Sequence, residues 1–177
     1  MADLTSVEFQ DLNSADLFLR LGQPAAPPSP AFQIGSDDLV VIVNRQNPIT
    51  GLTIDQVRGL FNGQIQNWKD INKTDARVQV WVFPSGEDAE QIFESSVLEG
   101  SPVTSQARLA NNPDEMSKAI AEDVAAVGII TRHWEAGNTS QVFTIAANLP
   151  VLAITPSKPQ AALEQILSCL QKGGQQK

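Results

Sequence analysis

Few side chains in this sequence are of the types that catalyse reactions, and their spacing limits what they can do. Glu87 and Asp88 are adjacent carboxylates that follow a Pro-Ser-Gly run. A carboxylate pair can act as general acid and base, but neighbouring residues at a helix start point apart and more often bind the free amides there. His133 stands beside Trp134, as is typical of a surface or packing histidine. The sequence therefore does not indicate an enzyme.

The single cysteine, Cys169, excludes a disulfide within the chain. It falls in an apolar helical pattern, so we expect a small core residue rather than a reactive thiol. With one histidine and one cysteine, the chain has no His/Cys cluster at metal-ligand spacing. The Gly-x-Ser-x-Gly motif of serine hydrolases is also absent from the sequence. We expect neither a bound metal nor a cofactor.

The composition limits the kinds of partner. The chain has 177 residues, of which 42% are hydrophobic, enough for one domain with a substantial core. Twenty acidic residues against twelve basic ones give a net charge of −8, which argues against a nucleic-acid or anionic-membrane surface. No segment reaches the roughly 20 apolar residues of a membrane span. Residues 1–20 lack the basic start and apolar run of a signal peptide, so an exported protein would have its export signal outside this sequence.

The segment LTIDQVRGLFNGQIQNW, residues 52–68, contains the most completely specified element. Thr53 can cap a helix with its hydroxyl while the Gln56 side chain returns the bond, which makes a capping box. Asn62-Gly63 predicts the end of this helix, because glycine readily adopts the left-handed conformation that closes one. The apolar residues recur at helical spacing and predict one buried face: Ile54, Val57, Leu60 and Phe61. These features specify an amphipathic helix and do not specify a function.

Predicted strands and helices alternate along the chain, as is typical of an α/β fold. Continuous apolar runs predict buried strands at residues 39–43 and 125–131. A further strand is predicted at 78–83, and shorter candidates lie at 15–21, 142–146 and 150–155. Within the run 125–131, Gly128 would allow a close backbone approach. We therefore expect a mixed sheet of about five strands flanked by helices.

Helical patterns fill the intervals between these strands. They cover residues 84–98, entered at Ser85 or Gly86, a segment from Asn112 with Pro113 at the first helical position, and residues 160–172. The last helix has a stripe of Leu163, Ile166, Leu167 and Leu170, ended by Gly173-Gly174. The proline-rich residues 23–30 predict an extended loop.

The order of these segments resembles one family. The strand and turn LVVIVNRQNPI, residues 39–49, precede LTIDQVRGLFNGQIQNWKDI, residues 52–71. This run resembles the central motif of the type II periplasmic binding protein superfamily, in particular the phosphate-binding proteins of phosphate ABC transporters. The matching positions are Val43, Asn44, Asn47, Pro48, Leu52, Thr53, Gln56, Val57, Leu60, Phe61, Gly63, Asn67 and Trp68. The segment AAVGIITRHW is similar to the family's A-x-G-Y segment, with Ile129 in place of tyrosine.

The resemblance implies a fold and a division of the chain. Complete proteins of this family have two α/β lobes that close on a ligand between them. The family's opening portion has no counterpart here, so we expect a single periplasmic-binding-protein-like lobe over residues 1–177, either a piece of a longer protein or a natural single lobe. Residues 1–38 would supply an N-terminal strand and the proline-rich loop, 39–145 the core lobe, and 146–177 a closing strand and C-terminal helix.

The resemblance also locates a ligand site. Phosphate-binding relatives hold the anion with an arginine on a strand and a Ser-Gly-Thr at the next helix start, where free amides favour negative charge. Here Ser85 and Gly86 are kept, but Glu87 stands in place of threonine, Asp88 follows, and no arginine precedes the turn. Each like charge within about 5 Å of a bound anion costs on the order of 1 kcal/mol or more.

The acidic replacement leaves two interpretations of this segment. In the first, a degenerate anion site takes a neutral or cationic ligand through Ser85, the Gly86 amide and the Glu87 carboxylate. In the second, Glu87 and Asp88 cap the helix and no ligand binds.

Two functions fit these expectations. The first is a solute-binding-protein-like domain of an ABC-type transport or sensing system, with a small-molecule ligand and a permease or envelope protein as partners, in the periplasm or at the cell surface. The second is a ligand-free lobe that serves as a protein-interaction or scaffold module, for which a homodimer would be typical. The effector domain of a transcription regulator has a related fold but needs a DNA-binding helix-turn-helix, and this chain has no basic recognition segment.

Overall fold

The computed structural model describes residues 17–22, 30–72, 74–135 and 137–174. The proline-rich loop predicted at residues 23–30 therefore lies almost entirely outside the described residues. The chain divides into two compact units: unit 2 is Asp38–Ala147, and unit 1 combines residues 1–37 with 148–177. The segment predicted to bind a ligand belongs to unit 2.

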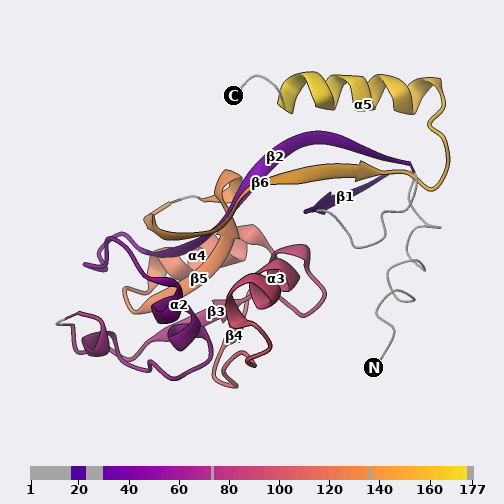
Figure 1. Ribbon diagram of the computed structural model, residues 1–177. Helices are drawn as coiled ribbons and strands as arrows, with labels where there is room; N and C mark the ends of the chain where they lie inside the picture. Colours follow the sequence, from indigo (N-terminus) through magenta and orange to yellow (C-terminus); the bar gives the residue numbers. More distant parts are fainter. Residues whose placement is uncertain (1–16, 23–29, 73, 136, 175–177) are drawn as a thin grey trace. The chain divides into compact units, whose positions relative to one another are not determined.

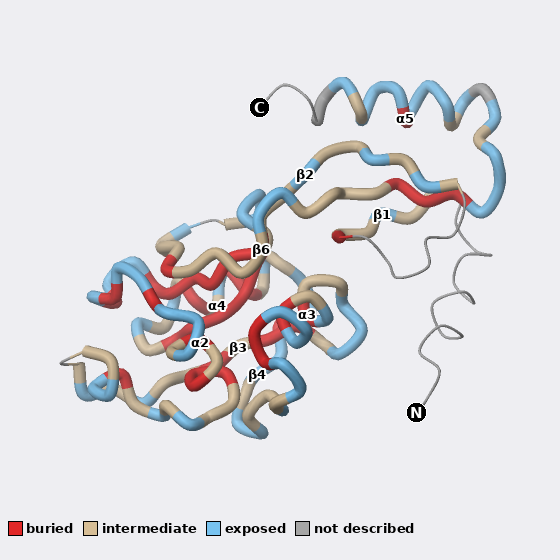
Figure 2. The backbone as a smooth tube through the Cα atoms, in the orientation of Figure 1, coloured by how far each residue is buried: buried red, intermediate tan, exposed pale blue. Residues whose placement is uncertain are grey.

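Unit 2 is built on a mixed sheet with β5 (Ala126–Thr131) as an inner strand. β5 pairs antiparallel with β2 (Ala31–Asn44), with Leu39 opposite Thr131, and parallel with β3 (Gln79–Val82). β3 pairs parallel with the two-residue strand β4 (Arg108–Leu109) (Figure 1). Residues 39–43 and 126–130 are all buried (Figure 2). Both continuous apolar runs are therefore buried strands, as predicted.

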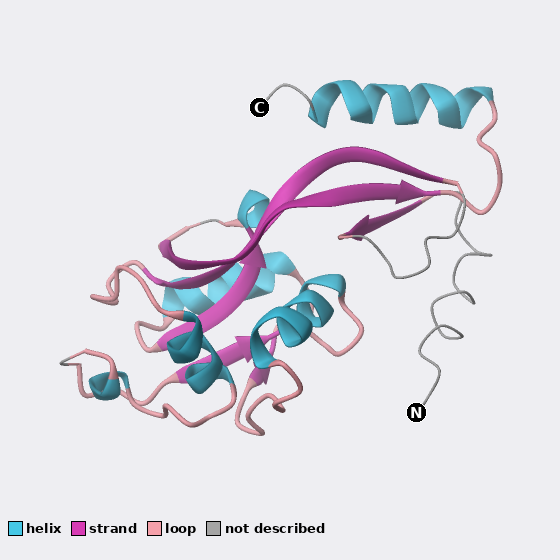
Figure 3. Ribbon diagram, in the orientation of Figure 1, coloured by secondary structure: helices cyan, strands magenta, loops and turns pink. Residues whose placement is uncertain are grey.

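Helices cover both faces of this sheet. α4 (Pro113–Glu122) packs closely on β5, because a Cβ added at Gly128 would meet Met116 Sδ at 2.5 Å. The close approach predicted at Gly128 is present, but side chains of α4 make it, not another backbone. α2 (Ile54–Phe61) and α3 (Asp88–Phe93) lie on the other side of the strands (Figure 3). The rings of Phe61 and Phe93 join these two helices, with centroids 4.6 Å apart.

The start of α2 has the predicted capping box. Thr53 Oγ1 accepts a hydrogen bond from the Gln56 N–H at 3.3 Å, and Gln56 Oε1 accepts one from the Thr53 N–H at 2.9 Å. Gly63 has φ +80°, as a glycine that ends a helix requires. The prediction for Ile54 is wrong: its exposed fraction is 41%, because the buried face of α2 begins only at Val57.

Three side chains of the family-like motif bind backbone carbonyls within residues 120–125, at the end of α4 and just after it. Asn44 Nδ2 donates to two of these carbonyls at 3.1 and 2.8 Å, and Asn47 Nδ2 donates to a third at 3.0 Å. Trp68 opens the 3-10 helix η1 (Trp68–Asp70), is fully buried, and donates from Nε1 to Ala125 O at 2.9 Å. Since a helix end leaves carbonyls without partners, this part of the motif is explained by the fold alone.

The helix predicted over residues 84–98 starts later than expected. α3 begins at Asp88, with Glu87 as its N-cap residue, and continues as the π-helix η2 (Glu94–Leu98). The residues before it form a turn, because Gly86 has φ +104° and cannot belong to a right-handed helix. The predicted end agrees with the end of η2.

In unit 1, β1 (Phe18–Leu21) pairs antiparallel with β6 (Thr139–Ile154), with Phe18 opposite Ile154. The sequence predicted two strands at 142–146 and 150–155, but β6 is continuous. Asn148 lies inside it with φ +55°. Asparagine tolerates this left-handed conformation better than most residues, so the apparent turn signal does not interrupt the strand.

α5 (Ala161–Gly174) differs from its prediction in two ways. It runs through Gly174 instead of ending before the two glycines. Its predicted apolar stripe is only partly buried: Leu167 is 4% exposed, whereas Ile166 is 50% exposed. Cys169, three residues after Ile166, is exposed too. The prediction that Cys169 is a core residue is therefore wrong, because it lies on the uncovered face of the helix.

Across the described residues, neighbouring strands are hydrogen-bonded in the order β1-β6-β2-β5-β3-β4. The predicted α/β class with a mixed, helix-flanked sheet is confirmed, with six strands where about five were expected. No helix in the described ranges combines the length and the apolar character that crossing a bilayer requires.

Candidate functional site

The predicted site forms the turn between β3 and α3. The chain passes through Ser85 and Gly86 to Glu87, whose N–H donates to the Pro84 carbonyl at 3.2 Å. Gly86 has φ +104°, although an added Cβ would meet no atom within 4 Å. Glycine is therefore required here by backbone conformation and not by lack of space. Gln91 Nε2 donates to the Gly86 carbonyl at 2.9 Å, so α3 holds the turn in this shape.

The polar groups of this turn are open to a ligand. Ser85, Gly86 and Glu87 are all exposed. In the part of the chain that the structure describes, neither the Ser85 hydroxyl nor the amide N–H of Ser85 or Gly86 has a hydrogen-bond partner. Glu87 makes no side-chain capping bond, so the prediction that it caps the helix is wrong. Its side chain is longer than those of the residues that cap helices well, and its carboxylate stays available at the turn.

The turn lies at the carboxyl edge of the parallel strands. The registers place Val80 opposite Val127 and Val82 opposite Leu109. β5, β3 and β4 therefore end at one edge of the sheet, and Thr131, Ser85 and Asn111 are among the residues at or just beyond these ends. Ligands of open α/β sheets bind outside the carboxyl ends of the strands. The turn thus lies at the edge of the sheet where other open α/β proteins bind their ligands.

An arginine reaches this edge from β5, although none precedes the turn on β3. Arg132 opens the 3-10 helix η3 (Arg132–Trp134), directly after β5. Its Nε and Nη2 both lie 2.9 Å from Asp38 Oδ2. Arg132 was not among the predicted site residues, because it follows β5 and not the strand before the turn. The available signal was that Arg132 directly follows the buried run 125–131. Because Asp38 already pairs with it, the positive charge of Arg132 is largely compensated.

The buried carboxylate of Glu90 binds the chain just before the turn. Glu90 is 2% exposed, and its Oε2 accepts a hydrogen bond from the Phe83 N–H at 3.2 Å. Burial raises the pKa of Glu90 to about 7, the bond from Phe83 lowers it, and the charge of Glu94 raises it further. Glu90 was not among the predicted site residues. Its signal was the spacing: Glu90, Phe93 and Val97 recur at i, i+3 and i+7 on the buried face.

The remaining reactive side chains lie outside this arrangement. His133 is exposed, and its ring meets the Trp134 ring edge-on, with centroids 5.8 Å apart. Among the described residues, no three His, Cys, Asp or Glu side chains gather in a way that could hold a metal ion. The site thus offers a hydroxyl, two amides and a carboxylate. These groups can bind and orient a small polar molecule.

Comparisons with known proteins give the family. A model described as a PBP superfamily domain matches residues 20–168. Phosphate-binding protein PstS of Staphylococcus haemolyticus (strain JCSC1435) is 27% identical over 78 residues, which are 42% of this chain and 25% of that protein. The match therefore spans about a quarter of that relative's length.

Solved structures share the fold at low sequence identity. An ABC-type phosphate transport receptor from Vibrio cholerae has a TM-score of 0.68 at 21% identity, over 94% of this chain and 78% of that one. A protein from Clostridium perfringens, described as a phosphate ABC transporter substrate-binding protein with bound phosphate, has a TM-score of 0.82 at 15% identity, over 96% and 79% of the two chains.

The resemblance seen in residues 39–71 thus extends over most of the chain, because the family model covers residues 20–168. The chain belongs to the PBP superfamily.

Proposed function

We propose that this protein is a solute-binding domain of an ABC-type transport or sensing system, and that it acts outside the cytoplasm with a permease or other envelope protein as partner. The observation that carries this proposal is the turn of Ser85, Gly86 and Glu87. It places an exposed hydroxyl, two amides without a partner among the described residues and a carboxylate at the carboxyl edge of the sheet. Phosphate receptors of ABC transporters among the structural relatives support a transport role.

The solute is a neutral or cationic molecule rather than phosphate. The exposed Glu87 carboxylate stands at the turn, and at about 5 Å it would raise the free energy of a bound monoanion by about 1–3 kcal/mol. Arg132 does not offset this cost, because Asp38 Oδ2 already accepts from its guanidinium at 2.9 Å. An ammonium or amide group, in contrast, can donate to Glu87 while the Ser85 hydroxyl accepts a second hydrogen bond.

A thermal-shift screen of the natural full-length protein tests this proposal. The panel contains amino acids, polyamines, divalent cations and oxyanions, and a binder raises the melting temperature in proportion to its concentration over Kd. We expect a neutral or cationic compound to bind and Glu87→Gln to weaken it at least tenfold. Glu94→Gln is the matched control, because Glu94 is also exposed but lies in η2, away from the turn. Failure of every compound to shift the wild-type protein would refute the proposal.

A gain-of-function variant makes the test sharper. Glu87→Thr restores the residue that the family resemblance predicts, and Asp38→Asn releases the Arg132 guanidinium from its carboxylate. We expect the double variant to bind inorganic phosphate more tightly than the wild-type protein. Equal phosphate affinity in both proteins would mean that these two carboxylates do not set the ligand class.

The ion pair between Arg132 and Asp38 also favours a second candidate function. If Asp38 and Glu87 have removed ligand binding altogether, the lobe would serve as a protein-interaction or scaffold module. Its signature would be a stable homodimer or a captured envelope protein in a preparation that no small molecule stabilises. A monomer by light scattering that responds to a solute would exclude this alternative.

A further inference from the structure

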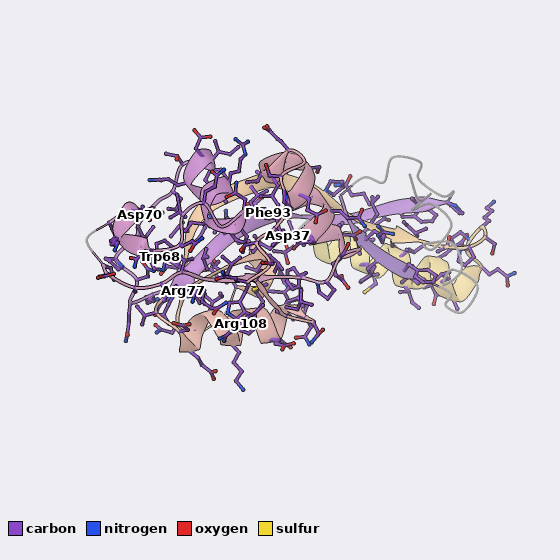
Figure 4. The ribbon with its side chains drawn as sticks, turned by 90° about the horizontal axis from the view of Figure 1, so that it is seen from below. Asp37, Trp68, Asp70, Arg77, Phe93 and Arg108 are labelled. Atoms are coloured by element: carbon purple, nitrogen blue, oxygen red, sulfur yellow. The ribbon has the colours of Figure 1, made fainter. Side chains whose placement is uncertain are left out.

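Two arginines line a pocket beside β3. Arg77 lies just before β3, and Arg108 is the first residue of β4 (Figure 4). The pocket has a volume of about 430 Å³ and is lined by Arg77, Val78, Gln79, Gln106, Arg108 and Asp123. We call it the arginine pocket. Its volume falls within the range of small-molecule sites, roughly 300–1,000 Å³.

Each guanidinium of the arginine pocket is positioned by a neutral partner. Arg77 Nη2 donates to the side-chain carbonyl of Gln106. Arg108 lies over the ring of Trp81, its register partner on β3, with its Cζ 5.6 Å from the ring centroid. This distance is within the range of a cation–π interaction. Both guanidiniums are therefore oriented, and neither contact removes their positive charge.

The two arginines differ in this respect from two others in unit 2. Arg58 forms ion pairs with Asp55 and Glu99, and Arg132 forms one with Asp38. Among the described residues, neither Arg77 nor Arg108 has a carboxylate within ion-pair distance. Two guanidiniums without a carboxylate at ion-pair distance in the described ranges therefore line one pocket of a chain whose net charge is −8. Such an arrangement fits the paired oxygens of a carboxylate or phosphate group.

One carboxylate also lines the arginine pocket. Asp123 follows α4, and its Oδ1 accepts a hydrogen bond from the Ala125 N–H at 2.9 Å. Its charge opposes a bound anion, so the three ionised groups leave the pocket with one net positive charge. Asp123 therefore supplies a test of sign: its removal should strengthen anion binding, whereas removal of either arginine should weaken it.

We infer that the arginine pocket is a binding site for a small anion whose carboxylate or phosphate oxygens bridge Arg77 and Arg108. The site is distinct from the turn that contains Ser85, because none of Ser85, Gly86 and Glu87 lines the arginine pocket. The inference goes beyond the solute-binding proposal and does not depend on it. A protein that fails to bind any solute at Glu87 can still bind an anion here.

An NMR titration of the 15N-labelled protein tests the inference. Inorganic phosphate and succinate are added separately at constant ionic strength, because salt screens exposed charges. We expect saturable shifts of the arginine Nε–Hε signals and of the backbone amides at residues 77, 106 and 108 with at least one of the two probes. The comparison of the two probes distinguishes a phosphate site from a carboxylate site.

Four variants decide between a built site and weak surface attraction. Arg77→Gln and Arg108→Gln should each weaken binding roughly tenfold or more, which corresponds to about 1.4 kcal/mol. Asp123→Asn should tighten it severalfold, and it keeps an amide oxygen for the Ala125 N–H. Arg45→Gln is the matched control, because Arg45 is exposed, forms no ion pair within the described ranges and lies outside the pocket.

Two results would contradict an anion site in the arginine pocket. One is a set of NMR shifts that rise linearly with anion concentration and do not saturate. The other is anion binding that Arg45→Gln weakens as much as Arg108→Gln does. If Arg108→Gln does not fold, the sign of the Asp123→Asn effect still decides, since unchanged or weaker binding in that variant contradicts the inference. Glu87→Gln should leave the titration unchanged, which separates this site from the solute site.

Discussion

Replacing Glu90 with glutamine tests the buried carboxylate beneath the turn. Glu90 is 2% exposed, and burial raises its pKa from 4.5 to about 7. An acid with a higher pKa in the folded state binds its proton more tightly when the protein is folded. The free energy of unfolding is therefore highest below pH 4.5 and falls as the pH rises through 7. The difference of about 2.5 units corresponds to about 3 kcal/mol, at about 1.4 kcal/mol per unit.

We expect the wild-type protein to lose up to about 3 kcal/mol through this group between about pH 4 and 8.5, and Glu90→Gln to lose none of it. The amide does not ionise, and its oxygen can still accept the Phe83 N–H. Urea unfolding followed by tryptophan fluorescence gives both free energies at each pH. Subtracting one free energy of unfolding from the other at each pH cancels the contribution of the titratable groups that the two proteins share. Between low and high pH, Glu90→Gln should therefore lose less of its free energy of unfolding than the wild-type protein does.

Glu94→Gln is the control for this experiment. The charge of Glu94 raises the pKa of Glu90, so its removal should lower that pKa without abolishing the pH dependence. A constant difference between Glu90→Gln and wild type from about pH 4 to 8.5 would refute the reasoning. A titration midpoint near 4.5 for the Glu90 carboxyl carbon, measured by NMR, would refute it directly.

Three further predictions concern the packing of unit 2 and are checked by urea unfolding at neutral pH. Trp68→Phe should cost about 1–3 kcal/mol, because it removes a buried hydrogen bond and part of a buried ring, whereas Trp134→Phe at an exposed position should cost little. Asn44→Ala should cost about 2–4 kcal/mol, because two carbonyls and one amide lose their partner. Gly128→Ala should cost about 1–3 kcal/mol, because its Cβ would meet Met116 Sδ at 2.5 Å. A loss below about 0.5 kcal/mol in Trp68→Phe, Asn44→Ala or Gly128→Ala would contradict the packing described.

Elements that rest on local patterns could be predicted from the sequence. The capping box of α2 depends on Thr53 and Gln56, three residues apart, and both of its bonds are present. The same holds for α4, which begins at Pro113 with Asn112 accepting from the Glu115 N–H at 2.9 Å. Such caps need no distant partner, so their residue types carry the information.

Strand ends were predicted less well, because they depend on pairing with distant segments. β2 begins at Ala31, eight residues before the apolar run, and β6 passes through Asn148 without a break. Backbone hydrogen bonds of a ladder do not require a particular side-chain pattern. The length of a paired strand is therefore set by its partner as well as by its own sequence.

The composition of the candidate site was only partly predictable for the same reason. Ser85, Gly86 and Glu87 are consecutive, so a motif could locate them. Arg132 and Asp38 are 94 residues apart, and only the register of β2 against β5 brings them together. Glu90 looks like an ordinary surface carboxylate of a helix until its position on the buried face is counted.

The hydrogen bonds from Asn44, Asn47 and Trp68 can form only late in the synthesis of this chain. Their carbonyl acceptors follow them in the chain by 57 to 77 residues. At roughly 5–20 residues per second, a ribosome needs about 3–15 s to make the intervening segment. During that interval α2 can already form from its own caps, while these three donors can bond only to water or to a chaperone. The most recognisable stretch of the chain is thus completed only after residues 120–125 have been made.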